Sequence, residues 1–195
     1  SGTDTTVTTG TGLDVGGDDL GLSDVTADHR ALGLDVSGSN TSTGLLSLED
    51  VRSRHSTRGL RLSRIAAAPT LDGLTLQDNQ FALTLFTWSA SFTLDASHSL
   101  DVSGSATGLE LQDPVGNLTV DGTGLVFDNP AYGIYVNSYS DTAPYTIRHV
   151  DVSGSGRGVG LSLTGRRWSA TDVTANERAT GVSAIVNPTA TGSLS

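Results

Sequence analysis

The chain has 195 residues and a formal net charge of −10, with 21 acidic residues against 11 cations. A chain this acidic that has no basic stripe is not expected to bind nucleic acid. No apolar run approaches the roughly 20 residues that a membrane-spanning helix needs. Nucleotide-binding glycine motifs, a serine-hydrolase elbow and cysteine are all absent. Disulfides therefore contribute nothing to stability, and no cofactor is expected beyond a weak case for Ca²⁺.

One sequence phrase occurs seven times. An aliphatic anchor is followed eight residues later by Gly or Ala, and then by an aliphatic–any–aliphatic triplet. The anchors are Val25, Val51, Leu74, Leu100, Leu125, Val150 and Val173. The small residues before the triplets are Gly33, Gly59, Ala82, Gly108, Gly133, Gly158 and Gly181. The anchors recur every 23 to 26 residues, which is a period typical of solenoids.

Each triplet has the alternation of a half-buried strand, so we expect its ends to face a core and its centre to face outward. A second alternating segment precedes most anchors, as in Leu20–Leu22 and Leu46–Leu48. Glycine before the triplet leaves room for the backbone of a neighbouring coil. Two or three short strands per coil would let stacked coils bury a shared core that no single coil can form alone.

This pattern resembles the right-handed parallel β-helix repeat family, which includes pectate-lyase-like enzymes, tailspikes and surface adhesins. The resemblance covers about residues 12–187 and implies an all-β, single-stranded right-handed parallel β-helix of seven to eight coils. We expect one domain over residues 1–195, with a polar segment at 1–11 that partly caps the first coil and a polar tail at 188–195. An ordinary β-sandwich with coincidental glycines is the alternative.

The middle of the chain differs in composition from both ends. Residues 65–147 contain no Arg or Lys, nine acids, every Phe and Tyr, and one of the two Trp. Such a belt could stack on sugar rings or collect Ca²⁺. The candidate ligand-binding residues are Trp88, Tyr135, Tyr139, Asp101 and Asp128. Alternatively, the aromatic residues fill a wider core and the acids keep the surface soluble.

Two residue pairs should lie side by side in consecutive coils. Asp35 and Arg61 share the outward triplet position, so we expect them about 4.8 Å apart as a surface ion pair. His29 and His55 share a position after the anchor and could supply half of a metal site. No third ligand accompanies them, so we expect solvated turn residues and no metal.

The chain offers little for catalysis. Lyases that act on polyuronates need cations on the central coils, and these coils have none. Arg148 and His149 border the central coils but are expected to stand alone. Asp101 and Asp151 share an outward column two coils apart, about 9.6 Å by strand spacing, which is close to the separation in an inverting glycosidase. Such coincidences are expected in an acidic chain. We therefore expect no enzyme and assign no catalytic residue, with a glycoside hydrolase as the alternative.

These features favour a structural role. The leading hypothesis is a β-solenoid of a secreted or cell-surface protein, serving as a rigid spacer, an adhesin segment or a self-assembling filament subunit. The abundant Ser, Thr, Gly and Asp motivate the extracellular location. No amphipathic helix is available to cover the coil ends, so loops, a longer parent chain or self-association through those ends must do so. The alternative is a carbohydrate-binding or polysaccharide-degrading module that uses the central coils.

Overall fold

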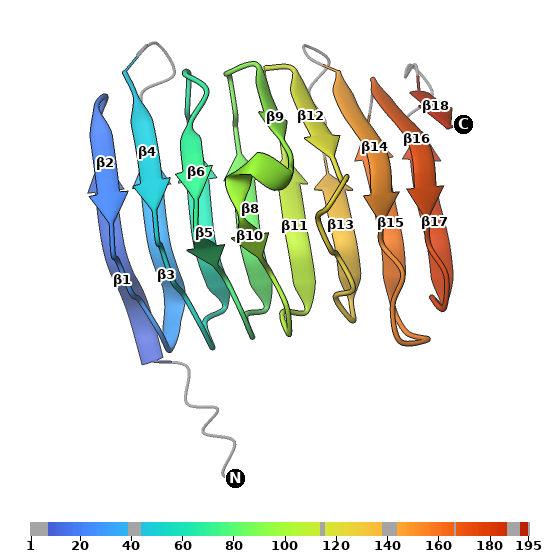
Figure 1. Ribbon diagram of the computed structural model, residues 1–195, viewed down its shortest axis with the longest axis horizontal. Coiled ribbons are helices and arrows are strands. Elements are labelled where there is room, and N and C mark those ends of the chain that lie inside the picture. The colour runs from blue at the N-terminus through green and yellow to red at the C-terminus, as the bar shows by residue number, and fades with distance from the viewer. Residues whose placement is uncertain are drawn as a thin grey trace, which may run out of the picture.

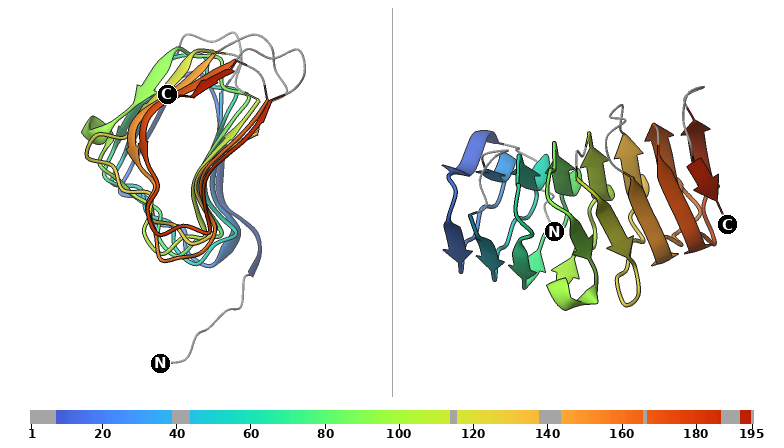
Figure 2. Two further views of the ribbon diagram at one scale, coloured as in Figure 1. Left: turned by 90° about the vertical axis from the view of Figure 1, so that its right-hand side faces the viewer. Right: turned by 90° about the horizontal axis from the view of Figure 1, so that it is seen from above.

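The computed structural model describes residues 8–38, 44–113, 116–137, 144–165, 167–186 and 192–194. These residues form a right-handed parallel β-solenoid, as the repeat predicts (Figure 1). The solenoid makes about six turns rather than the seven to eight expected. The largest sheet has eight strands, which is more than the number of turns, because the strands at each end belong to incomplete coils. Seen along its axis, successive coils superimpose into one flattened loop (Figure 2).

The first face is an eight-stranded parallel sheet with strand order β1-β3-β5-β8-β11-β13-β15-β17, called here the long sheet. Its strands are β1 (Thr8–Gly16), β3 (Arg30–Ser37), β5 (Arg58–Ser63), β8 (Phe81–Phe86), β11 (Thr107–Gln112), β13 (Tyr132–Asn137), β15 (Val159–Gly165) and β17 (Thr180–Val186). Leu60, Leu83 and Leu109 are register partners on neighbouring parallel strands. The glycine-led segments therefore stack as the repeat requires.

The remaining faces are shorter parallel sheets with orders β2-β4-β6, β7-β10 and β9-β12-β14-β16-β18. The first two contain β2 (Leu20–Ser23), β4 (Leu46–Glu49), β6 (Thr70–Asp72), β7 (Leu74–Thr75) and β10 (Leu100–Asp101). The third contains β9 (Phe92–Leu94), β12 (Leu118–Asp121), β14 (Tyr145–Asp151), β16 (Trp168–Thr174) and β18 (Gly192–Leu194). A 3₁₀ turn, Ala96–His98, follows β9 and is capped by the Asp95 carboxylate. No helix within the described residues is long and apolar enough to cross a membrane.

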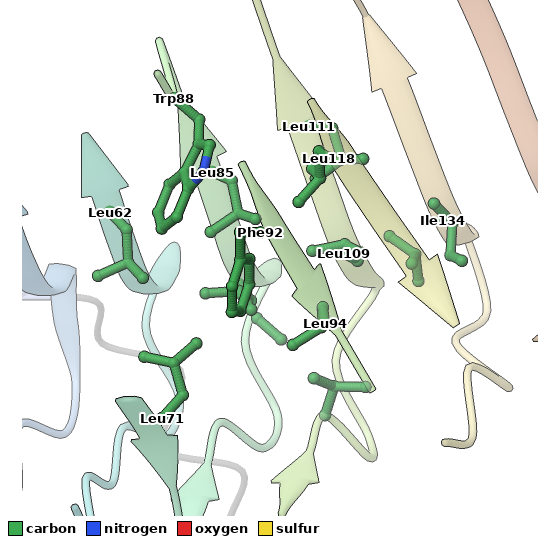
Figure 3. Packing of buried hydrophobic residues seen from close by; sticks show 14 of the residues in the cluster. Leu62, Leu71, Leu85, Trp88, Phe92, Leu94, Leu109, Leu111, Leu118 and Ile134 are labelled. Carbon is green, nitrogen blue, oxygen red and sulfur yellow. The ribbon is translucent and has the colours of Figure 1, made fainter. Parts of the chain in front are cut away.

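The core is one continuous cluster of apolar side chains that runs along the axis. Triplet ends from the long sheet meet residues of the opposite faces, as Leu85 and Leu111 meet Phe92 and Leu118 (Figure 3). The first inward column is completely buried from β3 to β15, and comprises Leu34, Leu60, Leu83, Leu109, Ile134 and Leu161. Fully burying one such side chain stabilises the fold by about 1.5–3 kcal/mol, so the rungs hold one another in place.

The corner in front of every anchor has a left-handed backbone. The residue just before each of the seven anchors has positive φ, namely Asp24, Asp50, Gly73, Ser99, Gly124, His149 and Asp172. Asp and His are enriched in this region among non-glycine residues, and Gly enters it freely. This conformation turns the chain from one face to the next, so it fixes where each anchor points.

The repeat is misassigned in one coil. Leu161 and Leu163, not Val159 and Leu161, are the partners of Ile134 and Val136. The small residue before the triplet is therefore Gly160, whereas Gly158 lies in the turn with φ of +68°. The turn after Val152 is two residues longer than its equivalents, and spacing counted from the anchor cannot detect this insertion.

The termini also differ from expectation. Strand β1 begins at Thr8, inside the polar segment 1–11 that was expected to form a partial cap. Residues 192–194, expected to be a polar tail, form β18 and pair with β16. Alternating polar residues in an edge strand give a weak sequence signal because only one side of the strand needs to be apolar.

Candidate functional site

Three columns of side chains project from the outer surface of the long sheet. The central column consists of the triplet centres Asp14, Asp35, Arg61, Thr84, Glu110, Tyr135, Ser162 and Ser183. Although these residues face away from the core, Asp35, Thr84 and Glu110 are buried. Neighbouring outward side chains must therefore cover them, so the middle of this surface holds an enclosed polar region.

The centre of this region is the Glu110 cluster, formed by Arg58, Phe81, Thr84, Glu110 and Gln112. The Glu110 carboxylate accepts hydrogen bonds from the Thr84 hydroxyl (3.0 Å) and the Gln112 amide (2.7 Å). Arg58 Nη2 lies 3.4 Å from the same carboxylate. The side chain of Glu110 is only 3 % exposed and that of Arg58 is 33 % exposed. Three donors thus stabilise a carboxylate that solvent barely reaches.

Aromatic rings flank this cluster. The Arg58 guanidinium lies over the Phe81 ring, 4.8 Å from its centroid, in a cation–π contact. The Tyr132 and Tyr135 rings are 5.0 Å apart on β13, beside β11. All three rings are half-buried, so part of each is open to solvent. The arrangement can stack against a flat ligand, but the enclosed Glu110 carboxylate is poorly placed to exchange protons with one.

Trp88 does not belong to this surface. Its backbone lies in the turn after β8, but the indole points into the core and is completely buried (Figure 3). The ring packs 5.4 Å from Phe92. The prediction that Trp88 binds a ligand is therefore wrong. Burial of its large apolar ring stabilises the fold more than exposure on a loop would. Here the hypothesis that aromatic residues widen the core holds.

The other candidate ligand-binding residues are scattered. Tyr135 faces outward on the long sheet, as predicted. Asp128 is exposed in the turn after Phe127 and lies outside the Glu110 cluster. Asp101 lies on β10, on a different face of the solenoid. Tyr139 lies outside the described residues. The predicted site is thus not brought together, and its aromatic and acidic members point in different directions.

Asp101 pairs with Thr75 of the preceding coil, and Asp151 pairs with Val126 of its own preceding coil. Each carboxylate accepts a hydrogen bond from the backbone N–H two residues on, at Ser103 (3.0 Å) and Ser153 (2.9 Å). For Asp101, burial opposes ionisation, but bonds from Ser103 and Gln77 outweigh it and lower the pKa. Bonds from Ser153 lower the pKa of Asp151. Neither residue has the raised pKa that a general acid needs, so the pair fits turn formation better than glycoside hydrolysis.

Two predicted contacts between coils are present. Arg61 Nε donates to Asp35 Oδ1 at 2.9 Å, and Nη2 pairs with Oδ2, so the ion pair is bidentate. The His29 and His55 rings lie 4.9 Å apart. No group of three metal-ligating side chains occurs among the described residues. The column assignments were therefore correct for both pairs.

Arg148 and His149 are not isolated, contrary to expectation. Arg148 Nε lies 2.9 Å from Asp121 Oδ2, and His149 Nδ1 lies 3.2 Å from Asp121 Oδ1. His149 Nε2 also approaches Asp172 at 3.5 Å. Hydrogen bonds from Thr123, then from His149 and Arg148, lower the pKa of Asp121 far below its ordinary range. This network ties three consecutive coils together on the surface.

Sequence reasoning missed the Glu110 cluster. Glu110 entered the sequence analysis only as one of the nine acids of residues 65–147, and Arg58 lies outside that segment. The signal was available, because both lie at outward positions of the repeat, two coils apart. Aligning the strands by their triplets places the two residues near each other, whereas comparing the composition of whole segments does not.

Comparison with models of known families, with curated proteins and with solved structures finds no match to this chain. The fold and the contacts themselves are therefore the basis for inferring function.

Proposed function

We propose that the chain is a structural β-solenoid of a secreted or cell-surface protein, acting as a rigid spacer, an adhesin segment or a filament subunit. The observation that carries this proposal is the uninterrupted inward column from Leu34 to Leu161, every member of which is completely buried. A core continuous along the axis resists bending because every rung packs on both neighbours. The abundance of Ser, Thr, Gly and Asp supports an extracellular setting.

The polar chemistry supports the same role. The most enclosed carboxylate, Glu110, is held by three donors, and the Asp35 carboxylate is held by a bidentate arginine. Asp101 and Asp151 support turns in their ionised form. These groups stabilise the coils and leave no obvious acid–base pair for bond cleavage.

Incubating the purified chain with a panel of acidic and neutral polysaccharides tests this proposal. We expect no release of reducing ends, and an elongated particle in small-angle X-ray scattering. Sugar release abolished by Asp101→Asn or Asp151→Asn would overturn the structural proposal and establish a glycoside hydrolase. A matched control is Asp72→Asn, since Asp72 lies exposed on β6, on a separate face.

The second candidate function is carbohydrate binding on the outer surface of the long sheet. The observation that favours it is the half-exposed group of Phe81, Tyr132 and Tyr135 beside the polar atoms of Arg58 and Gln112. Sugar rings stack on aromatic faces while their hydroxyls bond to nearby polar groups. A glycan array tests this directly.

Binding that is lost in Tyr132→Ala and retained in Thr93→Ala would favour this second function. Thr93 is exposed on β9, in the five-stranded sheet, so it controls for nonspecific surface effects. A Trp88→Ala variant would not discriminate, because removing a buried indole destabilises the fold before it changes any surface.

A further inference from the structure

The two ends of the solenoid expose side chains whose counterparts are buried elsewhere. In the middle coils, the inward residues of the long sheet, such as Leu60 and Leu62, are completely buried. Their counterparts Leu13 and Val15 on β1, and Val182 on β17, are only partly buried. Leu20, Leu22 and Val25 at the first end are likewise only partly buried. Each end therefore presents an apolar cross-section of the core.

The backbone at each end of the solenoid also lacks a neighbouring strand. Within the described residues, β1 and β17 are the two edges of the long sheet, and β18 is an edge of the five-stranded sheet. An edge strand presents unpaired N–H and C=O groups that can accept another strand. Because every strand pairs in parallel, only an arrangement that places the last coil against a first coil continues the existing pattern.

The charges at the ends favour the same orientation, with a last coil against a first coil. Residues 8–29 contain five Asp and no Arg, so two first coils placed together would repel each other. Residues 157–186 contain four Arg and two acids. Asp14, Asp18, Asp19 and Asp24 at the first end are exposed, as are Arg157 and Arg167 near the other. The acidic first coil thus complements the mildly basic last coils.

We propose that the partner of each end is a second copy of this chain, stacked head to tail with β17 and β18 against β1 and β2 of the next copy. Continuing the register places Val182 beside Leu13 and Ala184 beside Val15, with Ser183 beside Asp14 on the outer surface. The proposal rests on the structural function proposed above and specifies the filament subunit among its forms. Stacking buries both apolar cross-sections and pairs both edges of the long sheet.

Two variants test the interface separately. Val15→Lys places a charge on the first end only, and Val182→Lys places one on the last end only. Both positions are partly exposed, so a lysine can extend to solvent in the monomer. In the stack, the same lysine would be enclosed against apolar residues, and we expect association to weaken about tenfold or more. Circular dichroism and thermal melting establish that each variant is folded.

Analytical ultracentrifugation supplies the decisive comparison. The unaltered chain should show a mass that rises with concentration above its 20.0 kDa monomer, with linear rods in electron microscopy. Each variant alone should remain monomeric, because every contact would include one altered end. An equimolar mixture should form dimers and nothing larger, since one intact last end and one intact first end remain available. The pair Leu13→Lys and Ala184→Lys should reproduce this behaviour.

A chain that stays monomeric at every concentration would overturn the stacking proposal, and so would variants that associate as well as the unaltered chain. A rigid, inactive monomer would still satisfy the structural function. Release of sugars from a polysaccharide would instead overturn the structural function itself, so the two failures are distinguishable.

Discussion

Arg58 Nη2 and Glu110 Oε2 lie 3.4 Å apart although 52 residues separate them in the sequence. The two side chains reach across β8 from β5 and β11, over Thr84 and alongside Phe81. The contact therefore spans three rungs of the long sheet. Arg58 Nε, by contrast, is buried and has no hydrogen-bond partner among the described residues, so the guanidinium is only partly satisfied.

Arg58→Ala is expected to lower the free energy of unfolding by about 1–3 kcal/mol, because it leaves the enclosed Glu110 carboxylate with fewer donors. Chemical denaturation measures this change. In a double-mutant cycle with Glu110→Gln, the coupling energy should be about 0.5–3 kcal/mol. Additivity of the two single changes would contradict a direct interaction. Thr93→Ala, on the five-stranded sheet, is the surface control.

Leu109→Ala is expected to destabilise the protein by about 2–5 kcal/mol, because it opens a cavity in the inward column. Leu109 is completely buried between register partners Leu83 and Ile134. Leu109→Asp should prevent folding, since a carboxylate there has no partner. The control is Ile185→Ala, whose side chain is 62 % exposed; a similar loss at both positions would contradict the assigned core.

Gly133→Ala is expected to destabilise the protein by about 1–3 kcal/mol through overpacking. A Cβ atom there would lie 2.7 Å from the Phe127 carbonyl oxygen and 2.9 Å from the Gly160 carbonyl oxygen. Backbone atoms cannot move aside as a flexible side chain can. Gly21→Ala is the matched control, because nothing lies within 4 Å of its Cβ position. Thermal melting should separate the two variants clearly.

Acid should destabilise the protein through its ionised turn residues. The folded-state pKa values of Asp101 and Asp151 are lowered, so their stabilising contribution is complete above the unfolded-state pKa of about 3.9. That contribution is lost as pH falls through the lower folded-state values. In the double variant Asp101→Asn/Asp151→Asn, the free energy of unfolding should fall less steeply with decreasing pH below about pH 4. An unchanged slope would argue that these two carboxylates do not contribute to the pH dependence. Asp72→Asn serves as the control.

The sequence predicted the fold well because the regular spacing of apolar residues follows directly from which positions are buried. Leu60, Leu83 and Leu109 became strand partners as their spacing required. Asp35 paired with Arg61 because one repeat position maps to one column. The misplacement of Gly158 has a specific cause, since a two-residue insertion in a turn changes the spacing without changing the strand that follows.

The candidate site was less predictable because composition does not say which way a side chain points. Trp88 shared the acidic, aromatic middle with Tyr135, yet one ring is buried and the other faces outward. Glu110 and Arg58 lie in segments of opposite composition and still meet across three rungs. Outward neighbours depend on strand register, so they become visible only after the coils are aligned.

The account depends on one rigid stack of rungs, and the distance between its first and last coils tests this most directly. The chain has no cysteine, so Thr11→Cys and Thr180→Cys place two spin labels at exposed positions of one outward column. Seven interstrand steps of about 4.8 Å separate these positions, or about 34 Å. With the labelled chain diluted into an excess of unlabelled chain, so that labels on stacked copies do not meet, double electron–electron resonance should give one narrow distribution centred near that distance. A broad distribution, or one centred far from it, would contradict the rigid solenoid and the structural role inferred from it.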